Sequence, residues 1–146
     1  MNIKICGLKR PADIDAVNAM QPDFVGFVFA DSRRRITFDE AAALKEKLDT
    51  RIRAVGVFVN PEPGDIVRLC LDGVIDLVQL HGDEDEAYIA ALKRDISCPV
   101  IKAVRVQSPE QVLAAEQLPC DYLLLDTYRK NAYGGTGESF DYALIP

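Results

Sequence analysis

The feature that most constrains the fold of this sequence is a regular alternation of short apolar runs with helical patterns. Six runs rich in β-branched and other apolar residues start about every 20 to 30 positions: Ile3 to Cys6, Phe24 to Phe29, Ala54 to Val59, Leu77 to Leu80, Val100 to Val104 and Tyr122 to Leu125. Near-continuous apolar character is typical of strands buried on both faces, as in a parallel sheet. The runs therefore predict six parallel strands.

A helical pattern separates each run from the next. The start and stop signals are Pro11 at a first helical position, the capping boxes Thr37 to Glu40 and Ser108 to Gln111, Asn60-Pro61 and Asp83 to Glu86 as helix openings, and Gly73 as a helix end. A repeating strand–helix unit of this kind implies a parallel sheet with right-handed crossovers.

Two architectures fit such a repeat, an open doubly wound sheet and a (β/α)8 barrel of the TIM type. No Gly-x-Gly-x-x-Gly follows the first run and no Walker A motif is present, which weakens the case for a nucleotide-binding open sheet. Polar and reactive residues follow the expected strands: Cys6, Arg33 and Arg34, Asn60, His81, Arg105 and Asp126. In a barrel this face carries the active site, so the pattern favours the barrel.

The expected barrel is incomplete. The 146 residues hold about six βα units, whereas a (β/α)8 barrel normally needs at least about 200 residues. We therefore expect residues 1–146 to form a single α/β domain, a (β/α) barrel that is truncated at its C-terminus. Two open sheet edges could then pair with a second copy or with a complementing chain.

Composition excludes several classes of partner. Seventeen basic and 23 acidic residues give a net charge of −6, which disfavours nucleic acid as a partner. The apolar runs are far shorter than the roughly 20 residues of a membrane span, and no signal peptide is recognisable. The four cysteines are scattered without a zinc-type spacing, so we expect reduced thiols, no metal and a cytoplasmic location.

Several short motifs, in order along nearly the whole chain, resemble the phosphoribosylanthranilate isomerase family, the barrel enzymes of tryptophan biosynthesis. They are Lys4-Ile5-Cys6-Gly7-Leu8, Gly26-Phe27-Val28-Phe29, Ser32-Arg33-Arg34-Arg35-Ile36, Gly56-Val57-Phe58-Val59-Asn60, Gln79-Leu80-His81-Gly82, Ile101-Lys102-Ala103, Leu125-Asp126-Thr127, Gly134-Gly135-Thr136-Gly137 and Phe140-Asp141. Family members continue through two more βα units, whose closing loops hold the substrate phosphate. The sequence departs from the family there.

The resemblance implies an Amadori rearrangement, in which N-(5-phosphoribosyl)anthranilate, an aminoaldose, becomes an aminoketose without metal or organic cofactor. Cys6 matches the general base and would act as a thiolate, a form that an electropositive site favours. Asp126 matches the general acid and must hold a proton to donate it, which partial burial favours. Arg34 matches the arginine that grips the anthranilate carboxylate in a two-point contact.

The resemblance also implies three supporting positions. Gln79 and His81 would line the floor of the site without transferring protons, and Gly135 would belong to a loop that covers the phosphorylated sugar-anthranilate substrate. The other cysteines, Cys70, Cys98 and Cys120, are interpreted as packing residues.

Two rival hypotheses stay open at this stage. A non-catalytic chain could keep the early loops and act as a fragment or as half of an assembly. A different sugar-phosphate barrel enzyme, such as an indole-glycerol-phosphate synthase or a related aminoaldose isomerase, is disfavoured by the pairing of Cys6 with Asp126, because those relatives use lysine and glutamate or two aspartates at comparable places.

Overall fold

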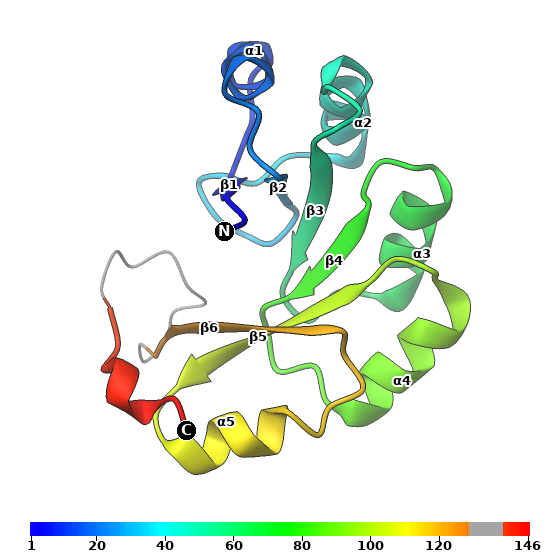
Figure 1. The fold of residues 1–146 in the computed structure, drawn as a ribbon. Helices are drawn as coiled ribbons and strands as arrows, with labels where there is room; N and C mark the ends of the chain where they lie inside the picture. The colour runs from blue at the N-terminus through cyan, green and yellow to red at the C-terminus, as the bar shows by residue number, and fades with distance from the viewer. Residues whose placement is uncertain (129–138) are drawn as a thin grey trace.

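A computed structural model describes residues 1–128 and 139–146 of the chain. Six strands form one sheet in the order β1-β2-β3-β4-β5-β6, and each strand runs parallel to its neighbours. Their bounds are β1 Lys4–Cys6, β2 Phe24–Val28, β3 Arg53–Phe58, β4 Leu77–Leu80, β5 Val100–Val106 and β6 Tyr122–Thr127. The sheet curls into a half-barrel (Figure 1), which confirms the barrel-type prediction over the open doubly wound sheet.

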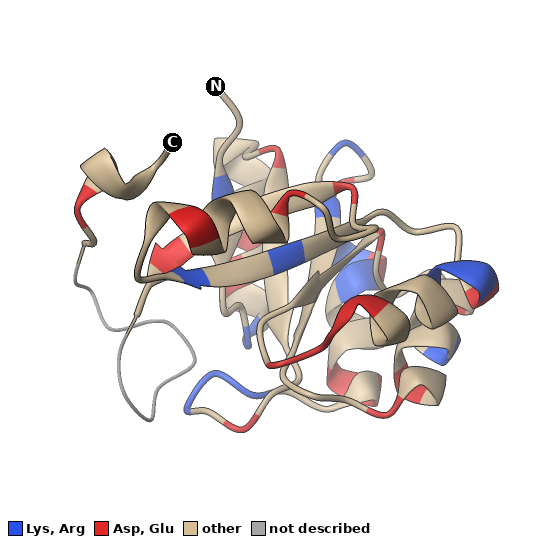
Figure 2. Ribbon diagram, turned by 90° about the horizontal axis from the view of Figure 1, so that it is seen from below, with Lys and Arg blue, Asp and Glu red and all other residues tan. Residues whose placement is uncertain are grey.

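Five helices alternate with the strands and cover the outer side of the curled sheet (Figure 1). They are α1 Pro11–Met20, α2 Phe38–Lys47, α3 Pro63–Leu71, α4 Glu86–Asp95 and α5 Pro109–Ala115, and a 3-10 turn, η1, follows at Tyr142–Leu144. Acidic and basic residues are interspersed over them (Figure 2). None of the helices in the described ranges is long and apolar enough to cross a bilayer.

The strand register divides the sheet residues between two faces. Residues paired across neighbouring parallel strands point to the same side, and successive residues point to opposite sides. One series faces the helices and forms the hydrophobic core with them, and its members include Val25, Phe27, Ala54, Phe58, Val78, Leu80 and Val100. The alternating series faces the inside of the half-barrel.

Three aspartates hold the strands in pairs at their amino-terminal ends. Asp23, just before β2, accepts a hydrogen bond from the N–H of Ile3 at 2.7 Å. Asp76, just before β4, accepts from Ala54 in β3 at 2.7 Å, and Asp121, just before β6, accepts from Val100 in β5 at 2.7 Å. These aspartate clamps join β1 to β2, β3 to β4 and β5 to β6. Lys45 and Lys93 form ion pairs with the second and third clamps.

The helix boundaries confirm some sequence signals and correct two of them. Thr37 and Glu40 form the predicted capping box, and Gly73 ends α3 with a φ of 68°. The helix expected to open at Asn60-Pro61 begins instead at Pro63. Asn60 adopts a left-handed φ of 46°, which is not a right-handed helical conformation, so the helix does not begin at this residue.

The second predicted capping box is only half formed. The Ser108 hydroxyl accepts the N–H of Gln111, as expected. The Gln111 side chain, however, accepts the N–H of Gln107 rather than that of Ser108. A glutamine side chain is long enough to extend past Ser108 to the backbone N–H of the residue before it.

Strands β1 and β6 are the two edges of the sheet. None of their residues is fully buried, whereas β4 is buried throughout. The difference follows from position, because an edge strand has a neighbour on one side only.

Candidate active site

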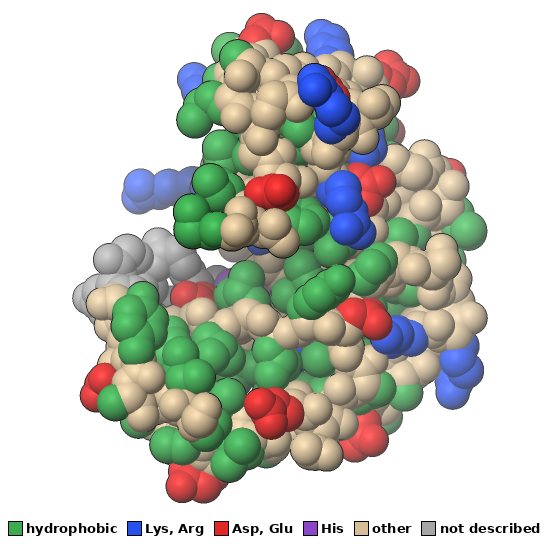
Figure 3. Space-filling model, viewed as in Figure 1, with side chains coloured by type: hydrophobic (Ala, Val, Ile, Leu, Met, Phe, Trp, Pro, Cys, Tyr) green, Lys and Arg blue, Asp and Glu red, His purple; other side chains and the backbone are tan. Residues whose placement is uncertain are grey.

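The inner face of the half-barrel gathers the candidate site residues at the carboxyl ends of the strands. Cys6 pairs with Gly26 across β1 and β2, and Arg105 pairs with Asp126 across β5 and β6. Gln79 lies on the same face, since it pairs with Val57 and Ile101. In the space-filling view the molecule is hollowed on this side (Figure 3).

Two glycines make room for the side chains at the end of β1. A Cβ atom at Gly26 would lie 2.5 Å from the Cys6 sulfur, so only glycine fits beneath this thiol. Gly7 has a φ of 93°, and the Arg34 side chain lies across it, close to where a Cβ would stand. Arg34 donates to the Cys6 carbonyl at 3.3 Å. The structure thus brings the predicted base and the predicted carboxylate-binding arginine together.

A chain of hydrogen bonds links Asp126 to the centre of the sheet. His81 Nε2 lies 2.9 Å from Asp126 Oδ2, and His81 Nδ1 lies 3.0 Å from Gln79 Nε2. Gln79 Oε1 in turn accepts a hydrogen bond from Lys4 Nζ of β1. Sequence reasoning paired neither His81 with Asp126 nor Lys4 with Gln79, because 45 and 75 residues separate the partners.

Burial shapes the charge states along this chain. Burial lowers the pKa of His81; Asp126 raises it, and the cations Lys4 and Lys102 lower it, with a net lowering. Burial also lowers the pKa of Lys4, while Cys6 raises it and Arg34 lowers it. The His81 imidazole therefore stays neutral down to a lower pH than a free histidine does.

A buried ion pair supports the loop that carries His81. Lys102 Nζ donates to Glu84 Oε2 at 2.7 Å and to the Gly82 carbonyl at 2.7 Å. The Lys102 and Glu84 side chains are only 8% and 1% exposed. Glu84 also accepts the backbone N–H groups of Gly82 and Asn60, so the pair ties the ends of β3, β4 and β5 together.

Asn60 and Gly82 complete this support. The Asn60 side chain accepts the N–H of Asp83 at 2.8 Å. A Cβ at Gly82 would lie 2.5 Å from the Asn60 side-chain oxygen, so the two loops touch where glycine alone fits. The sequence marked Asn60 as a polar residue after a strand, as a helix opening and as part of a family motif, and Glu84 only as part of a helix opening, so neither supporting role was predicted.

Arg105 is a further cation on the inner face. Its guanidinium donates to Asp83 at 2.5 Å, and its strand partner in the register is Asp126. The sequence marked Arg105 only as a polar residue after the fifth strand. Its place beside Asp126 makes the end of β5 part of the wall of the site.

The remaining predicted positions lie elsewhere. Gly135 falls outside the described residues. Cys70, Cys98 and Cys120 pack against the hydrophobic core, as predicted. The described ranges contain no group of three or more His, Cys, Asp or Glu side chains placed to hold a metal ion.

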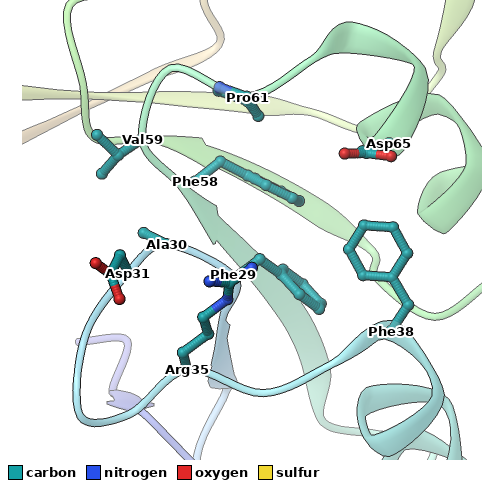
Figure 4. Close-up of a pocket in the computed structure, with 9 residues that line it drawn as sticks. All are labelled: Phe29, Ala30, Asp31, Arg35, Phe38, Phe58, Val59, Pro61 and Asp65. Atoms are coloured by element: carbon teal, nitrogen blue, oxygen red, sulfur yellow. The ribbon is translucent and has the colours of Figure 1, made fainter.

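A separate aromatic pocket lies between the ends of β2 and β3 on the helix side. Its volume is about 220 Å³, and Phe29 stacks on Phe58 at 5.2 Å while meeting Phe38 edge-on at 5.3 Å (Figure 4). Neither Cys6 nor Asp126 lines it. The pocket therefore belongs to the packing of the β2 and β3 loops rather than to the inner-face site.

Comparison with known proteins identifies similar chains and folds. Residues 3–146 match the family model of N-(5'-phosphoribosyl)anthranilate isomerase. A protein of that name from Lachnoclostridium phytofermentans is 51% identical over 145 residues, which are 99% of this chain and 66% of the relative. The chain thus spans just under two thirds of that relative's length.

Two solved structures share the fold. The phosphoribosyl anthranilate isomerase of Thermus thermophilus gives a TM-score of 0.82 at 35% identity and covers 99% of this chain and 69% of its own. Another isomerase of this name, in complex with reduced 1-(o-carboxyphenylamino)-1-deoxyribulose 5-phosphate, gives a TM-score of 0.75 at 33% identity, covering 88% of this chain and 66% of its own.

Proposed function

The chain belongs to the N-(5'-phosphoribosyl)anthranilate isomerase family, and from this premise we propose that it catalyses the Amadori rearrangement of N-(5'-phosphoribosyl)anthranilate in tryptophan biosynthesis. The observation that carries the proposal is the placement of a thiol and a carboxyl group at the same end of one concave face. Cys6 ends β1 and Asp126 lies in β6, and both belong to the inward-facing series of the register.

The proposed reaction needs one group that donates a proton to the substrate and one group that removes a proton from it. Asp126 protonates the ring oxygen of the sugar as the C1' bond to that oxygen breaks, which opens the ring to an iminium ion. The Cys6 thiolate then removes the proton on C2', and the electron pair of that bond forms an enamine. The enol of this enamine tautomerises to the ketone, which completes the aminoketose. Two titratable groups suffice for these steps.

The substrate carries two anionic groups that the site must recognise. Arg34 is the proposed partner of the anthranilate carboxylate, because a planar guanidinium offers a two-point contact to a planar carboxylate. Its place across Gly7 keeps it beside Cys6. The complex of a relative with the reduced product analogue supports a phosphorylated ligand of this class for this chain.

The rival hypotheses now differ in support. Membership of the isomerase family decides against a different sugar-phosphate barrel enzyme. The non-catalytic chain, which would pair through its sheet edges with a second copy or a complementing polypeptide, is the alternative that the experiment must separate.

The test is the loss of fluorescence when the 146-residue chain meets N-(5'-phosphoribosyl)anthranilate formed in situ. We expect turnover that falls by about 10²–10⁴-fold in Asp126→Asn and in Cys6→Ser, the range of a lost general acid or base. Asp15→Asn, an exposed change of the same type on α1, should leave turnover unchanged.

Binding of the reduced product analogue gives a second readout. Arg34→Met should weaken binding, whereas Arg33→Met at the neighbouring exposed position should not. A chain that circular dichroism shows to be folded, but that neither turns over nor distinguishes these two variants, would support the non-catalytic alternative.

A further inference from the structure

We propose that Lys4 is a positioning residue that acts through Gln79 to fix His81 in its Nε2–H tautomer, so that the imidazole donates to the carboxylate of Asp126. The inference deepens the proposed function, since its catalytic meaning rests on Asp126 being the general acid. The four residues come from β1, from β4 and the loop after it, and from β6, and their hydrogen bonds form one continuous chain.

The first step is the orientation of the Gln79 amide. A lysine ammonium has donors and no acceptor, so the amide atom facing Lys4 must be the oxygen. The opposite orientation would place the amide NH₂ against an ammonium and leave two donors facing each other. Gln79 is only 3% exposed, so water cannot compensate for the wrong orientation.

The second step is the tautomer of His81. With its oxygen committed to Lys4, Gln79 presents its NH₂ group to His81 Nδ1 at 3.0 Å. Nδ1 must therefore accept, and a neutral imidazole that accepts at Nδ1 carries its proton at Nε2. The charged groups that act on this ring are Asp126, Lys4 and Lys102, and burial with the two lysines outweighs Asp126 and keeps the ring neutral.

The third step is the effect on Asp126. His81 Nε2–H donates to Oδ2 at 2.9 Å, and the backbone N–H of Thr127 donates to Oδ1 at 2.8 Å. Each carboxyl oxygen of Asp126 therefore faces one fixed N–H, and the two hydrogen bonds together fix the orientation of the carboxyl group. Lys4 thus acts on the acid from the opposite edge of the half-barrel without touching it.

The chain offers an unusually clean test, because His81 is its only histidine. Long-range proton–nitrogen correlation NMR of the ¹⁵N-labelled protein near neutral pH reports a single imidazole. We expect a pyridine-type shift at Nδ1 and a pyrrole-type shift at Nε2. A wild-type spectrum with a protonated Nδ1 would overturn the proposal.

Two variants separate the role of Lys4 from general packing. Lys4→Met keeps the length and apolar stem of the side chain but frees the amide to rotate, so the two nitrogen shifts should move toward each other. Lys9→Met removes the same charge from an exposed position that contacts the Arg33 carbonyl, and its imidazole spectrum should equal that of the wild type. A Lys4→Met spectrum identical to wild type would overturn the inference.

Gln79→Glu gives an independent readout should Lys4→Met fail to fold. A carboxylate can only accept, so Nδ1 must become protonated and lose its pyridine-type shift. Retention of that shift would contradict the orientation argued above. The NMR outcome does not require turnover, so failure of the isomerase proposal and failure of the tautomer proposal are distinguishable.

If turnover is present, kinetics test the catalytic meaning of the tautomer. Lys4→Met should lower kcat about tenfold or more with little change in KM, and shift the pH profile of kcat, whereas Lys9→Met should do neither. A loss confined to KM would show that Lys4 only helps to bind substrate.

Discussion

Gly26 sets the position of the Cys6 thiol from the neighbouring strand. A methyl group there would stand 2.5 Å from the sulfur and 3.1 Å from the Cys6 Cα. The sulfur would have to move, and the backbone of β1 with it. The requirement for glycine arises in β2, although the reacting atom belongs to β1.

We expect Gly26→Ala to lower kcat/KM by about 10²-fold, the cost of a displacement of about 1 Å at a reacting group. Isomerase turnover measures the effect. Gly64→Ala is the matched control, since a Cβ at Gly64 meets nothing within 4 Å. Equal activity of the two variants would show that the thiol does not depend on Gly26.

His81 links the site to the pH dependence of stability. Burial lowers its pKa in the folded chain from the ordinary 6.5. As the pH falls through about 6.5, the unfolded chain takes up a proton that the folded chain resists, so the free energy of unfolding falls with it. This loss continues until the pH reaches the folded-state pKa.

Urea unfolding between about pH 7.5 and 5, where histidine is the side chain that ordinarily titrates, measures this slope. His81→Gln should flatten the slope relative to the wild type. Carboxylates such as Asp121, whose pKa is also lowered, contribute equally to both proteins at lower pH. Identical slopes in the two proteins would refute the assignment.

At the scale of elements, the sequence predicted the strands well and the loops poorly. Continuous apolar runs are a local signal, and the run Leu77 to Leu80 coincides with β4. The predicted helix start was confirmed where a capping residue and its partner lie three residues apart, as at Thr37. At Asn60 the local signal was misleading, because the backbone there is fixed by Glu84, 24 residues further along.

The residues that support the site could not be predicted from local patterns, for the same reason. Cys6, Arg34, His81 and Asp126 were predicted as site residues because they match family motifs. Lys4, Glu84 and Lys102 stand in or beside the same motifs, but their roles depend on partners 18 to 75 residues away. Only the folded sheet brings such partners together.

The Glu84–Lys102 pair makes a sharp prediction for these loops. Lys102→Met leaves a buried carboxylate without its counter-ion, and we expect the free energy of unfolding to fall by about 3–5 kcal/mol. Arg68→Met, which removes an exposed pair with Asp72 at 3.6 Å, should cost less than about 1 kcal/mol.

Chemical denaturation measures both variants. The double variant Lys102→Met with Glu84→Gln should recover part of the loss, since it removes the unpaired charge as well. A loss in Lys102→Met no larger than in Arg68→Met would show that the pair is not a structural support.

At the scale of the whole molecule, β1 and β6 are the edge strands of the sheet over the residues that the structure describes. Tyr122 on β6 is 55% exposed, and Ile3 beside β1 is 50% exposed. An edge strand with exposed apolar side chains is a template for pairing with another strand. We therefore expect the 146-residue chain to associate as its concentration rises.

Sedimentation velocity over a range of concentrations tests this expectation. Tyr122→Lys places a charge on the edge and should shift the chain toward monomer without lowering its stability. Leu71→Lys, at a position that is 77% exposed on α3, is the control and should leave association unchanged. A wild-type chain that stays monomeric throughout would contradict the role of the edges.

The aspartate clamps lie on three successive strand pairs, and each pair contributes to the chain of hydrogen bonds that ends at Asp126. Lys4 comes from the first pair, Gln79 and His81 from the second, and Asp126 from the third. The ladders β2–β3 and β4–β5 join the pairs into one sheet. A local opening of either ladder would separate residues of this chain while leaving much of each local core in place. The chemistry of the site would therefore report such an opening even where the content of secondary structure hardly changes.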